Sequence, residues 1–497
     1  MINNIKEYVE KITQEKIAEI KASAGALSIS GTTYYVSNSG SDENDGLTPN
    51  TAWQTLDRVS SADLKCGDGV LFCRGDLFRG TVKTASGVSY GAYGDGEKPK
   101  FYGWEKDLAD PSLWELEDAE HFIWHFKEKI LDVGTLVFDE GEAHSRKLIP
   151  SYVDGRFVCR NDESRLFVMS EEMTKDLDIY WYYEDRLTTT PSKDLSFPIP
   201  IVDGESFGDL YLRCDGENPA VRFSSIEALT KRPMFLVGEC KNVTIDNLCM
   251  KYIGHHAVCA GGHVVGLQVT NCEIGWIGGT IQHYFGTDPN YPQGSRGSVT
   301  RFGNAIEIYG GCENYRVENC YIYQVYDAGI THQITTFGKT YNMSDIKYIG
   351  NVVEDCVYAI EYFLEMNEGD SESIMKDVLM SRNILRRSGY GWGQQRHNVD
   401  TPALIKGWSY ENRADNFVIE ENIFDRSAYR MLHLVAKHPE SCPIMRKNLY
   451  VQNNGGMLGQ YGANEYIEPP IVIFDDNVDR IIRDHLGDID AEIYTVE

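Results

Sequence analysis

Three acidic residues stand close to the copies of a short phrase that this sequence repeats. The phrase is a small residue, an isoleucine and one polar residue, and its copies occupy residues 305–307, 329–331 and 359–361. The first and third copies end in Glu307 and Glu361, and Asp327 precedes the second copy. Two carboxyl groups about 5 Å apart can protonate a leaving oxygen and attack a sugar carbon, as in retaining glycosidases. These residue types therefore favour cleavage of a glycosidic bond.

The spacing of the phrase predicts how the acids meet. It alternates with period 2 and returns after roughly 20 to 35 residues, which is typical of a solenoid of short strands. Neighbouring coils of a solenoid lie about 4.8 Å apart. Asp327 is then one coil from Glu307 or from Glu361, whereas the two glutamates are two coils apart. The alternative is that these acidic side chains stack along the outside of the solenoid and contact only solvent.

Several other residues are candidates for binding a sugar. His332 and Gln333 follow the second copy, Arg396 and His397 stand in a long insertion, and Trp104 could stack on a sugar ring. Each has a plain structural alternative, either a buried polar residue or a packing tryptophan. We predict Asp327 and Glu361 as catalytic residues, and the substrate-binding residues as Glu307, His332, Gln333, Trp104, Arg396 and His397.

No metal or other cofactor is expected. The 12 cysteines form no CxxC pair and no Cys/His cluster with the spacing of zinc ligands. Several fall on strand phrases, where a free thiol packs as a small hydrophobic group. Their number and scatter favour a reducing compartment.

The charge balance limits the class of partner. With 47 basic and 75 acidic residues the net charge is −28, and such a surface repels nucleic acid and anionic lipid. It also disfavours a polyanionic polysaccharide unless a local basic groove overrides it, so we expect short neutral oligosaccharides. Residues 1–25 predict an amphipathic helix rather than a signal peptide. No apolar run of about 18 residues exists, and we expect a cytoplasmic protein.

A second phrase, an alternating strand that ends in asparagine, predicts the elements that position the acids. It closes at Asn247, Asn271, Asn319, Asn351, Asn383, Asn422 and Asn448. Stacked asparagine amides at a turn hydrogen-bond along the coil axis, so we interpret these residues as structural. Insertions such as 284–302 and 393–414 would stack into a wall beside a groove. The fold class is therefore predicted as all-β, a parallel β-helix.

The presence or absence of the repeat spacing divides the chain into segments. Alternating strands with frequent turn signals over residues 106–233 predict an inserted antiparallel β-sandwich. The motif NVDRIIRDHL predicts a short helix that caps the last coil. The predicted segments are 1–30 (N-terminal helix), 31–105 (N-terminal cap and first coils), 106–233 (β-sandwich), 234–462 (main β-helix) and 463–497 (C-terminal tail).

Two stretches resemble a known family. Residues 34–103, with YYVS, TAWQTL and GDGVLFCRGD, resemble the N-terminal cap of right-handed parallel β-helix proteins of the carbohydrate-active kind. DVGTLVFDEG and GDLYLRCDGENPAVRFSSIE resemble the sandwich inserted into β-helix glycoside hydrolases that include β-xylosidases. The resemblance implies a right-handed, pectate-lyase-like solenoid. It also implies Glu307 as a supporting residue, Asp327 as nucleophile and Glu361 as acid/base of a retaining enzyme.

Other classes stay open. A polysaccharide lyase or an epimerase acting on uronate-containing glycans needs cations near the acids, and Arg396, Lys406 and Arg430 are the nearby candidates. His433 lies on the same coil as Arg430, and we interpret both as structural. A non-catalytic carbohydrate-binding protein is the third class. The sequence leaves open the sugar, the anomer, the stereochemical course and the oligomeric state, a homo-oligomer being one option.

Overall fold

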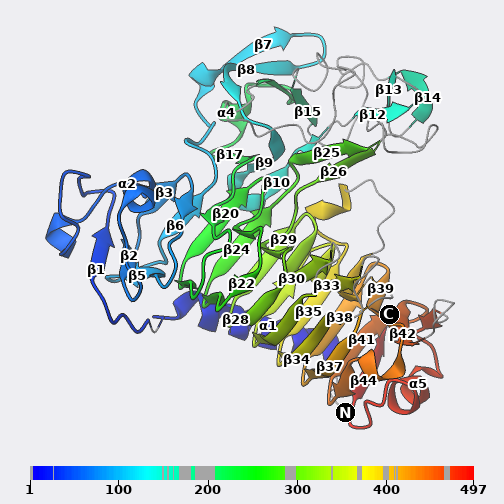
Figure 1. Ribbon diagram of the computed structural model, residues 1–497. Helices are drawn as coiled ribbons and strands as arrows, with labels where there is room; N and C mark the ends of the chain where they lie inside the picture. Colours follow the sequence, from blue (N-terminus) through cyan, green and yellow to red (C-terminus); the bar gives the residue numbers. More distant parts are fainter. Residues whose placement is uncertain are drawn as a thin grey trace.

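Three sheets of parallel strands run side by side along one axis and form the body of the molecule (Figure 1). The computed structural model describes residues 4–25, 27–147, 150–153, 156–159, 162–166, 181–184, 208–285, 298–336, 340–366, 372–395, 402–407, 409, 412–463 and 471–497. Each coil contributes one strand to each sheet in turn. The fold is the predicted right-handed parallel β-helix.

Sheet 1 contains the strands that precede the asparagines. Its members are β1 (Thr33–Val36), β2 (Gly69–Cys73), β5 (Ser89–Tyr93), β19 (Thr244–Asp246), β22 (Val264–Val265), β23 (Gln268–Thr270), β28 (Cys312–Glu318), β31 (Asn342–Ile349), β34 (Ile374–Ser381), β37 (Ala414–Glu420) and β40 (Ile444–Arg446).

Sheet 2 follows each asparagine. Its members are β3 (Leu77–Arg79), β6 (Lys100–Tyr102), β9 (Val133–Phe138), β10 (Ala143–His144), β17 (Ile226–Thr230), β20 (Cys249–Ile253), β24 (Glu273–Ile277), β29 (Tyr321–Val325), β32 (Val352–Glu354), β35 (Ile384–Ser388), β38 (Ile423–Ser427), β41 (Leu449–Asn453) and β44 (Glu492–Val496).

Sheet 3 contains the three copies of the phrase made of a small residue, an isoleucine and one polar residue. Its members are β4 (Val82–Lys83), β18 (Phe235–Leu236), β21 (Val258–Ala260), β27 (Ile306–Ile308), β30 (Ala328–Thr335), β33 (Tyr358–Glu365), β36 (Ala403–Gly407), β39 (Arg430–Ala436), β42 (Met457–Ala463) and β43 (Val472–Ile473).

The predicted asparagine ladder is present at the corner between sheets 1 and 2. The Nδ2 of Asn351 donates to Oδ1 of Asn383 at 2.9 Å, and Asn383 donates to Asn422 at 2.9 Å. Asn422 in turn donates to Asn448 at 3.1 Å. Because each amide also pairs with backbone groups of the next coil, the ladder satisfies buried polar groups at a corner that has no strand pairing.

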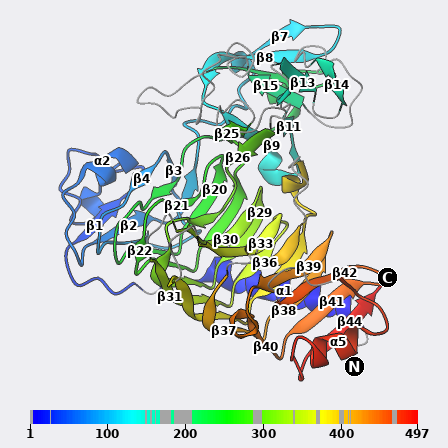
Figure 2. The same ribbon diagram turned by 45° about the vertical axis from the view of Figure 1, so that its right-hand side comes forward.

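The N-terminal amphipathic helix α1 (Ile5–Ala22) lies along the outer face of sheet 2 (Figure 2). Ile17 and Ile20 pack on strands β29, β32 and β35, whereas Ile5 and Val9 pack near β41 and β44. An α-helix rises about 1.5 Å per residue. The helix therefore spans several coils and covers apolar side chains that sheet 2 would otherwise expose.

The inserted segment packs against strands that continue sheet 2 of the solenoid. A five-stranded sheet contains β7 (Trp114–Asp118), β8 (Ile123–Ile130), β11 (Arg146–Lys147), β15 (Trp181–Glu184) and β16 (Gly208–Arg213). Its apolar side chains pack with those of β9 and β17, which extend sheet 2. The second layer of the predicted sandwich is thus a continuation of a coil sheet, because β9 pairs antiparallel with β17.

The remaining elements cap or link the coils. A small sheet contains β12 (Pro150–Val153), β13 (Arg156–Cys159) and β14 (Asp162–Leu166), and a hairpin contains β25 (Ile281–Phe285) and β26 (Ser298–Arg301). The predicted tail helix is α5 (Val478–Asp484), whose Val478 and Ile482 complete the core at the last coil. The described residues also form the α-helices α2 (Leu56–Ser61) and α4 (Pro219–Arg222).

The lengths of the connections show where a cleft can form. Corners from sheet 1 to sheet 2 are short, as at residues 350–351 and 382–383. Long connections instead border sheet 3 on both sides. Those entering sheet 3 are residues 278–305 and 389–402, and those leaving it include 336–341, 366–373 and 437–443. The long connections therefore begin and end at the edges of sheet 3, whose outer face is called the floor below.

Candidate active site

One row of side chains runs along the outer face of sheet 3. The strand register aligns Thr331 with Glu361, Glu361 with Lys406, and Lys406 with His433. The preceding residue of each strand is an aliphatic residue in the core, so alternation directs the row away from the core. The full row is Lys83, Leu236, Cys259, Glu307, Thr331, Glu361, Lys406, His433 and Gln460.

The row is buried although it faces outward. Lys83 and Leu236 are exposed at its beginning, whereas Glu307 is 8% exposed and Glu361 is 7% exposed. The matching outward row of sheet 1 has only half-buried or exposed side chains, from Thr244 to Ile444. The surrounding chain therefore covers sheet 3 over the coils that carry the acids, and an acidic ladder bathed by water does not describe this face.

Glu307 accepts hydrogen bonds from two side chains. Its Oε2 accepts from Nδ2 of Asn304, and from the Thr331 hydroxyl at 3.2 Å. The carbonyl of Asn304 lies 3.1 Å from Nδ1 of His256. Because both donors fix one oxygen of the carboxylate, Glu307 is suited to orient a substrate with its other oxygen.

Asp327 occupies the short corner between β29 and β30. Its N–H donates to the carbonyl of Gly303 at 3.1 Å, and its carbonyl accepts from the N–H of Tyr358 at 2.9 Å. The next N–H donates to Oδ1 of Asn304 at 3.0 Å, and the same amide contacts Glu307. A Cβ at Gly303 would lie 2.5 Å from Cβ of Asp327, so glycine is needed there. Asp327 thus lies one coil from Glu307, as predicted.

The insertion and a long loop close over this corner. Tyr326, beside Asp327, accepts a hydrogen bond from Nη1 of Arg301 at 3.2 Å and packs 5.2 Å from the ring of Trp392. Nη2 of Arg301 donates to the carbonyl of Gly134 in the insertion at 2.7 Å. These contacts fix the backbone that carries Asp327.

Glu361 lies beside a cation. Its Oε2 accepts from Nε2 of Gln333 at 2.7 Å, and its Oε1 lies 3.6 Å from Nζ of Lys406. The same ammonium donates to the hydroxyl of Tyr358 at 2.8 Å. A nearby ammonium and a donated hydrogen bond both favour the ionised carboxylate. Both contacts therefore favour the carboxylate form of Glu361 on the outer face of sheet 3.

The end of the row is cationic. Arg430 donates from Nη1 to Oε1 of Gln460, the residue that follows His433 in the row. His433 is 9% exposed, and neither ring nitrogen has a hydrogen-bond partner among the described residues. Burial, together with Arg430 and Lys406, lowers the pKa of His433 to about 3. The ring is therefore neutral near pH 7.

The structure places two predicted binding residues in the core. His332 is completely buried, where its ring stacks on Tyr362 and its Nδ1 lies 2.7 Å from the Tyr348 hydroxyl. Trp104 is 4% exposed and packs in the core of the insertion. Neither ring has a free face for a sugar, which corrects both expectations. Gln333 supports Glu361, and Arg396 and His397 lie outside the described residues.

His332 makes stability depend on pH. Burial lowers its pKa from 6.5 to about 3, so between these values the unfolded chain binds a proton that the folded chain does not. Folding is therefore stabilised by rising pH through this window, and stability is lost as the pH falls below 6.5. His332→Asn should remove about 2 kcal/mol of the loss between pH 7 and pH 5, measured by urea unfolding. Parallel pH profiles for the two proteins would contradict this.

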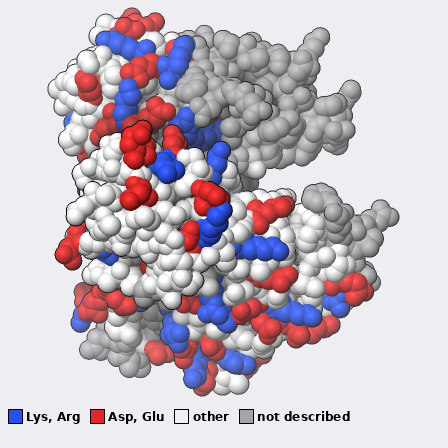
Figure 3. Space-filling model, turned by 60° about the vertical axis from the view of Figure 1, so that its left-hand side comes forward, with Lys and Arg blue, Asp and Glu red and all other residues white. Residues whose placement is uncertain are grey.

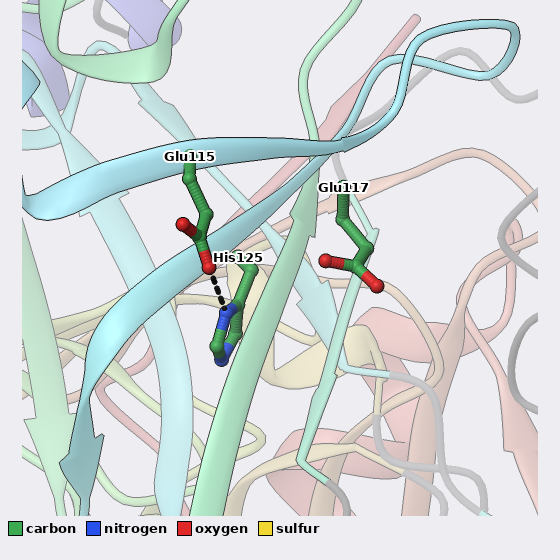
Figure 4. A group of neighbouring side chains, drawn as sticks. All are labelled: Glu115, Glu117 and His125. Atoms are coloured by element: carbon green, nitrogen blue, oxygen red, sulfur yellow. Dashed lines mark hydrogen bonds and ion pairs between the residues drawn. The ribbon is translucent and has the colours of Figure 1, made fainter.

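A group of possible metal ligands lies outside the solenoid (Figure 4). Glu115 and Glu117 on β7 and His125 on β8 are close enough to share an ion. However, Nδ1 of His125 lies 3.0 Å from Glu115 and its Nε2 lies 3.2 Å from Asp209. Both ring nitrogens of His125 therefore already contact carboxylate oxygens. The group reads as a surface ion-pair network of the insertion.

A separate cavity of about 710 Å³ lies at the first coils. Three cations contribute to its lining, Arg79, Lys83 and Arg232. Two of them already contact acids, since Arg79 pairs with Glu227 at 2.7 Å and Arg232 with Glu105 at 3.2 Å. Only Lys83 connects it to the row on sheet 3.

Sequence reasoning underestimated part of the row. Lys406 was considered only for a lyase, His433 only as structural, and Gln460 was not considered. A broader pattern would have found Lys406 and His433, because Leu404-Ile405-Lys406 and Met431-Leu432-His433 repeat two apolar residues and one polar residue. The strict requirement for a small residue and isoleucine excluded these copies.

Comparison with known proteins gives general likeness only. No family model matches the chain. No curated protein matches it either. Similar solved structures include a GH136 lacto-N-biosidase from Eubacterium ramulus, at 14% identity and a TM-score of 0.40, covering 98% of this chain and 70% of that one.

Two further structures are similar at the same level. The complex of XylC with xylose has 13% identity and a TM-score of 0.40, covering 90% of this chain and 88% of that one. A rhamnogalacturonan lyase has 11% identity and a TM-score of 0.36, covering 86% and 75%. The fold described above rests on the strand register itself. No helix among the described residues is long and apolar enough to cross a membrane.

Proposed function

We propose that the protein is a carbohydrate-active enzyme that hydrolyses glycosidic bonds of oligosaccharides on the outer face of sheet 3. The observation that carries the proposal is the burial of the outward row, in which Glu307 and Glu361 stay about one tenth exposed or less. Carboxylates in an outward solenoid row are ordinarily solvated. Here they line a covered floor, and the side chain of Asn304 links Glu307 to the backbone next to Asp327, which supports a site for paired-carboxylate chemistry.

The contacts of Glu361 suggest which carboxyl group attacks the sugar and which one delivers the proton. Gln333 and Lys406 favour its anion, which suits attack on the anomeric carbon. Asp327 is then the carboxyl group left to carry the proton to the leaving oxygen, and Glu307 orients the sugar. This assignment reverses the roles that the family resemblance implies for Asp327 and Glu361.

Elimination is the second candidate, and one observation favours it. Lys406 and the neutral ring of His433 follow Glu361 in the row, and Arg430 contacts the last residue of the row, Gln460. A lyase uses cations to neutralise a uronate carboxylate and a neutral base to remove the adjacent proton. The row holds both kinds of group.

Product analysis of the wild-type protein distinguishes these reactions. The panel is a set of nitrophenyl glycosides and uronide oligomers, followed by NMR of the products. We expect a free reducing sugar and no unsaturated product. Ultraviolet-absorbing unsaturated products would instead establish elimination, and binding without any product would establish a non-catalytic carbohydrate-binding protein.

A further inference from the structure

Two cations stand near the end of the row, beyond Glu361. Lys406 follows Glu361 in the row, and Arg430 donates a hydrogen bond to Gln460, the last residue of the row. Arg430 belongs to a neighbouring row that register aligns with Tyr358 and the small Ala403. Contacts from Lys406 to Tyr358 and from Arg430 to Gln460 join the two rows on one face.

His433 provides the second observation. It is 9% exposed, yet both of its ring nitrogens lack a hydrogen-bond partner among the described residues. Buried polar atoms are nearly always paired, and an unpaired one destabilises the fold. The ring stands in the outward row between Lys406 and Gln460, so it faces the covered floor. Its unmade hydrogen bonds are available to a ligand.

Lys406 also has donor capacity for a ligand. An ammonium carries three N–H donors, and Tyr358 and Glu361 use two at most. An oxyanion placed between Lys406 and His433 would accept from both and lie near the guanidinium of Arg430. Charge-assisted hydrogen bonds of this kind are about twice as strong as neutral ones.

We propose that Lys406, Arg430 and His433 form a subsite for one anionic group carried by a sugar, either a carboxylate or a sulfate ester. The substrate is then an acidic oligosaccharide rather than a neutral one. The proposal rests on the proposed function, because it places this sugar in the cleft that holds Glu361 and Asp327.

The net charge of −28 is compatible with a single anionic group. Over the part of the surface drawn in Figure 3, acidic and basic side chains are interspersed rather than gathered into one basic patch. A polyanion needs many cations along its length, whereas one oxyanion needs only the local group at the end of the row. The subsite therefore selects an acidic sugar without attracting polyanions in general.

Binding measurements test the subsite without requiring turnover. Calorimetry of the full chain would compare methyl β-D-glucuronide, methyl β-D-glucoside, the 6-sulfate of that glucoside, and acetate. We expect an anionic sugar to bind about tenfold or more tightly than the neutral one. The better of the carboxylate and the sulfate identifies the group. Equal affinity for neutral and anionic sugars, or acetate binding as tightly as the glucuronide, would overturn the proposal.

Variants locate the subsite. Lys406→Met and His433→Phe should reduce the preference for the anionic sugar to about threefold or less. Lys406→Arg should retain most of it. Lys347→Met is the matched control, because Lys347 is also half-buried but lies on sheet 1. Thermal unfolding of each variant checks that it folds.

The outcomes separate this proposal from the proposed function. If Lys406→Met loses the preference for the anionic sugar and the wild type hydrolyses no glycoside, the subsite proposal stands and the hydrolase proposal is wrong. If the wild type hydrolyses neutral glycosides and binds anionic sugars no more tightly, the hydrolase proposal stands and the subsite proposal is wrong. A preference that survives in Lys406→Met and His433→Phe together would also overturn the assignment.

Discussion

Replacing Glu361 with glutamine is expected to lower kcat on any hydrolysed glycoside by on the order of 10⁴-fold. Glutamine keeps the shape of the side chain and its contact with Gln333, but it cannot attack the anomeric carbon. The loss should be similar for aryl glycosides with good and poor leaving groups, because in both the carboxylate must bond to the anomeric carbon as the leaving group departs. Steady-state kinetics with two aryl glycosides that differ only in the leaving group measures this.

Asp327→Asn should behave differently in the same assay. A group that delivers a proton matters most when the leaving oxygen is basic, so turnover of a poor leaving group should fall by about 10²–10⁴-fold. The kcat/KM of a dinitrophenyl glycoside, which reports release of the leaving group, should fall far less, because that leaving group needs no proton. If the two variants show the opposite dependence on the leaving group, then Asp327 is the nucleophile and Glu361 the acid/base.

Glu420→Gln is the control for both variants. Glu420 stands on β37 of sheet 1, half-buried, with Arg446 at 4.0 Å as its partner. Its replacement should leave kcat within about twofold, as surface substitutions usually do. Wild-type turnover in Glu361→Gln and Asp327→Asn would remove the site assignment altogether.

Removing Arg386 is expected to have the largest effect on stability. This side chain is 1% exposed and contacts three carboxylates, Glu10 of helix α1 at 2.7 Å, Asp425 at 3.2 Å and Glu354 at 3.7 Å. Two of these carboxylates are buried, and burial raises the pKa of Glu354. Arg386→Leu should lower the free energy of unfolding by about 3 kcal/mol, because the buried Asp425 and Glu354 each lose one of their two arginine partners.

Urea unfolding followed by circular dichroism measures this change, with Arg316→Leu as the control. Arg316 lies on the outer face of sheet 1 and is one-third exposed, and its carboxylate partners are 3.6 and 4.0 Å away. Its loss should change stability by less than about 1 kcal/mol. A double variant, Arg386→Leu with Asp425→Leu, should recover part of the loss. An unchanged midpoint in Arg386→Leu would contradict this account of the cluster.

Most of the fold follows from local patterns. Period-2 alternation and the recurrent asparagines predicted the solenoid, and the 3.6-residue period of Ile5, Val9 and Ile20 predicted α1. The shared layer of the insertion was not predictable in this way. β9 and β17 alternate like any sandwich strand, and their pairing with a coil sheet depends on contacts far away in sequence.

The candidate site shows the same division. The shared row of Glu307 and Glu361 was predictable because register is periodic, and alternation should also have placed His332 inside, since it directly follows the outward Thr331. Trp104 required knowledge of how the insertion packs. The pairing of Glu361 with Lys406 depends on which coil follows across a long loop, which no local pattern reveals.

Helix α1 has a consequence for how the molecule melts. Arrays of repeats tend to fray from their ends, since each unit contacts only its neighbours. Here a single rigid rod touches Val451 and Val496 near the last coil as well as Tyr321 and Val352 several coils earlier. Fraying of the last coil must therefore also loosen the rod from the middle of the array, which makes disassembly of these coils a concerted event.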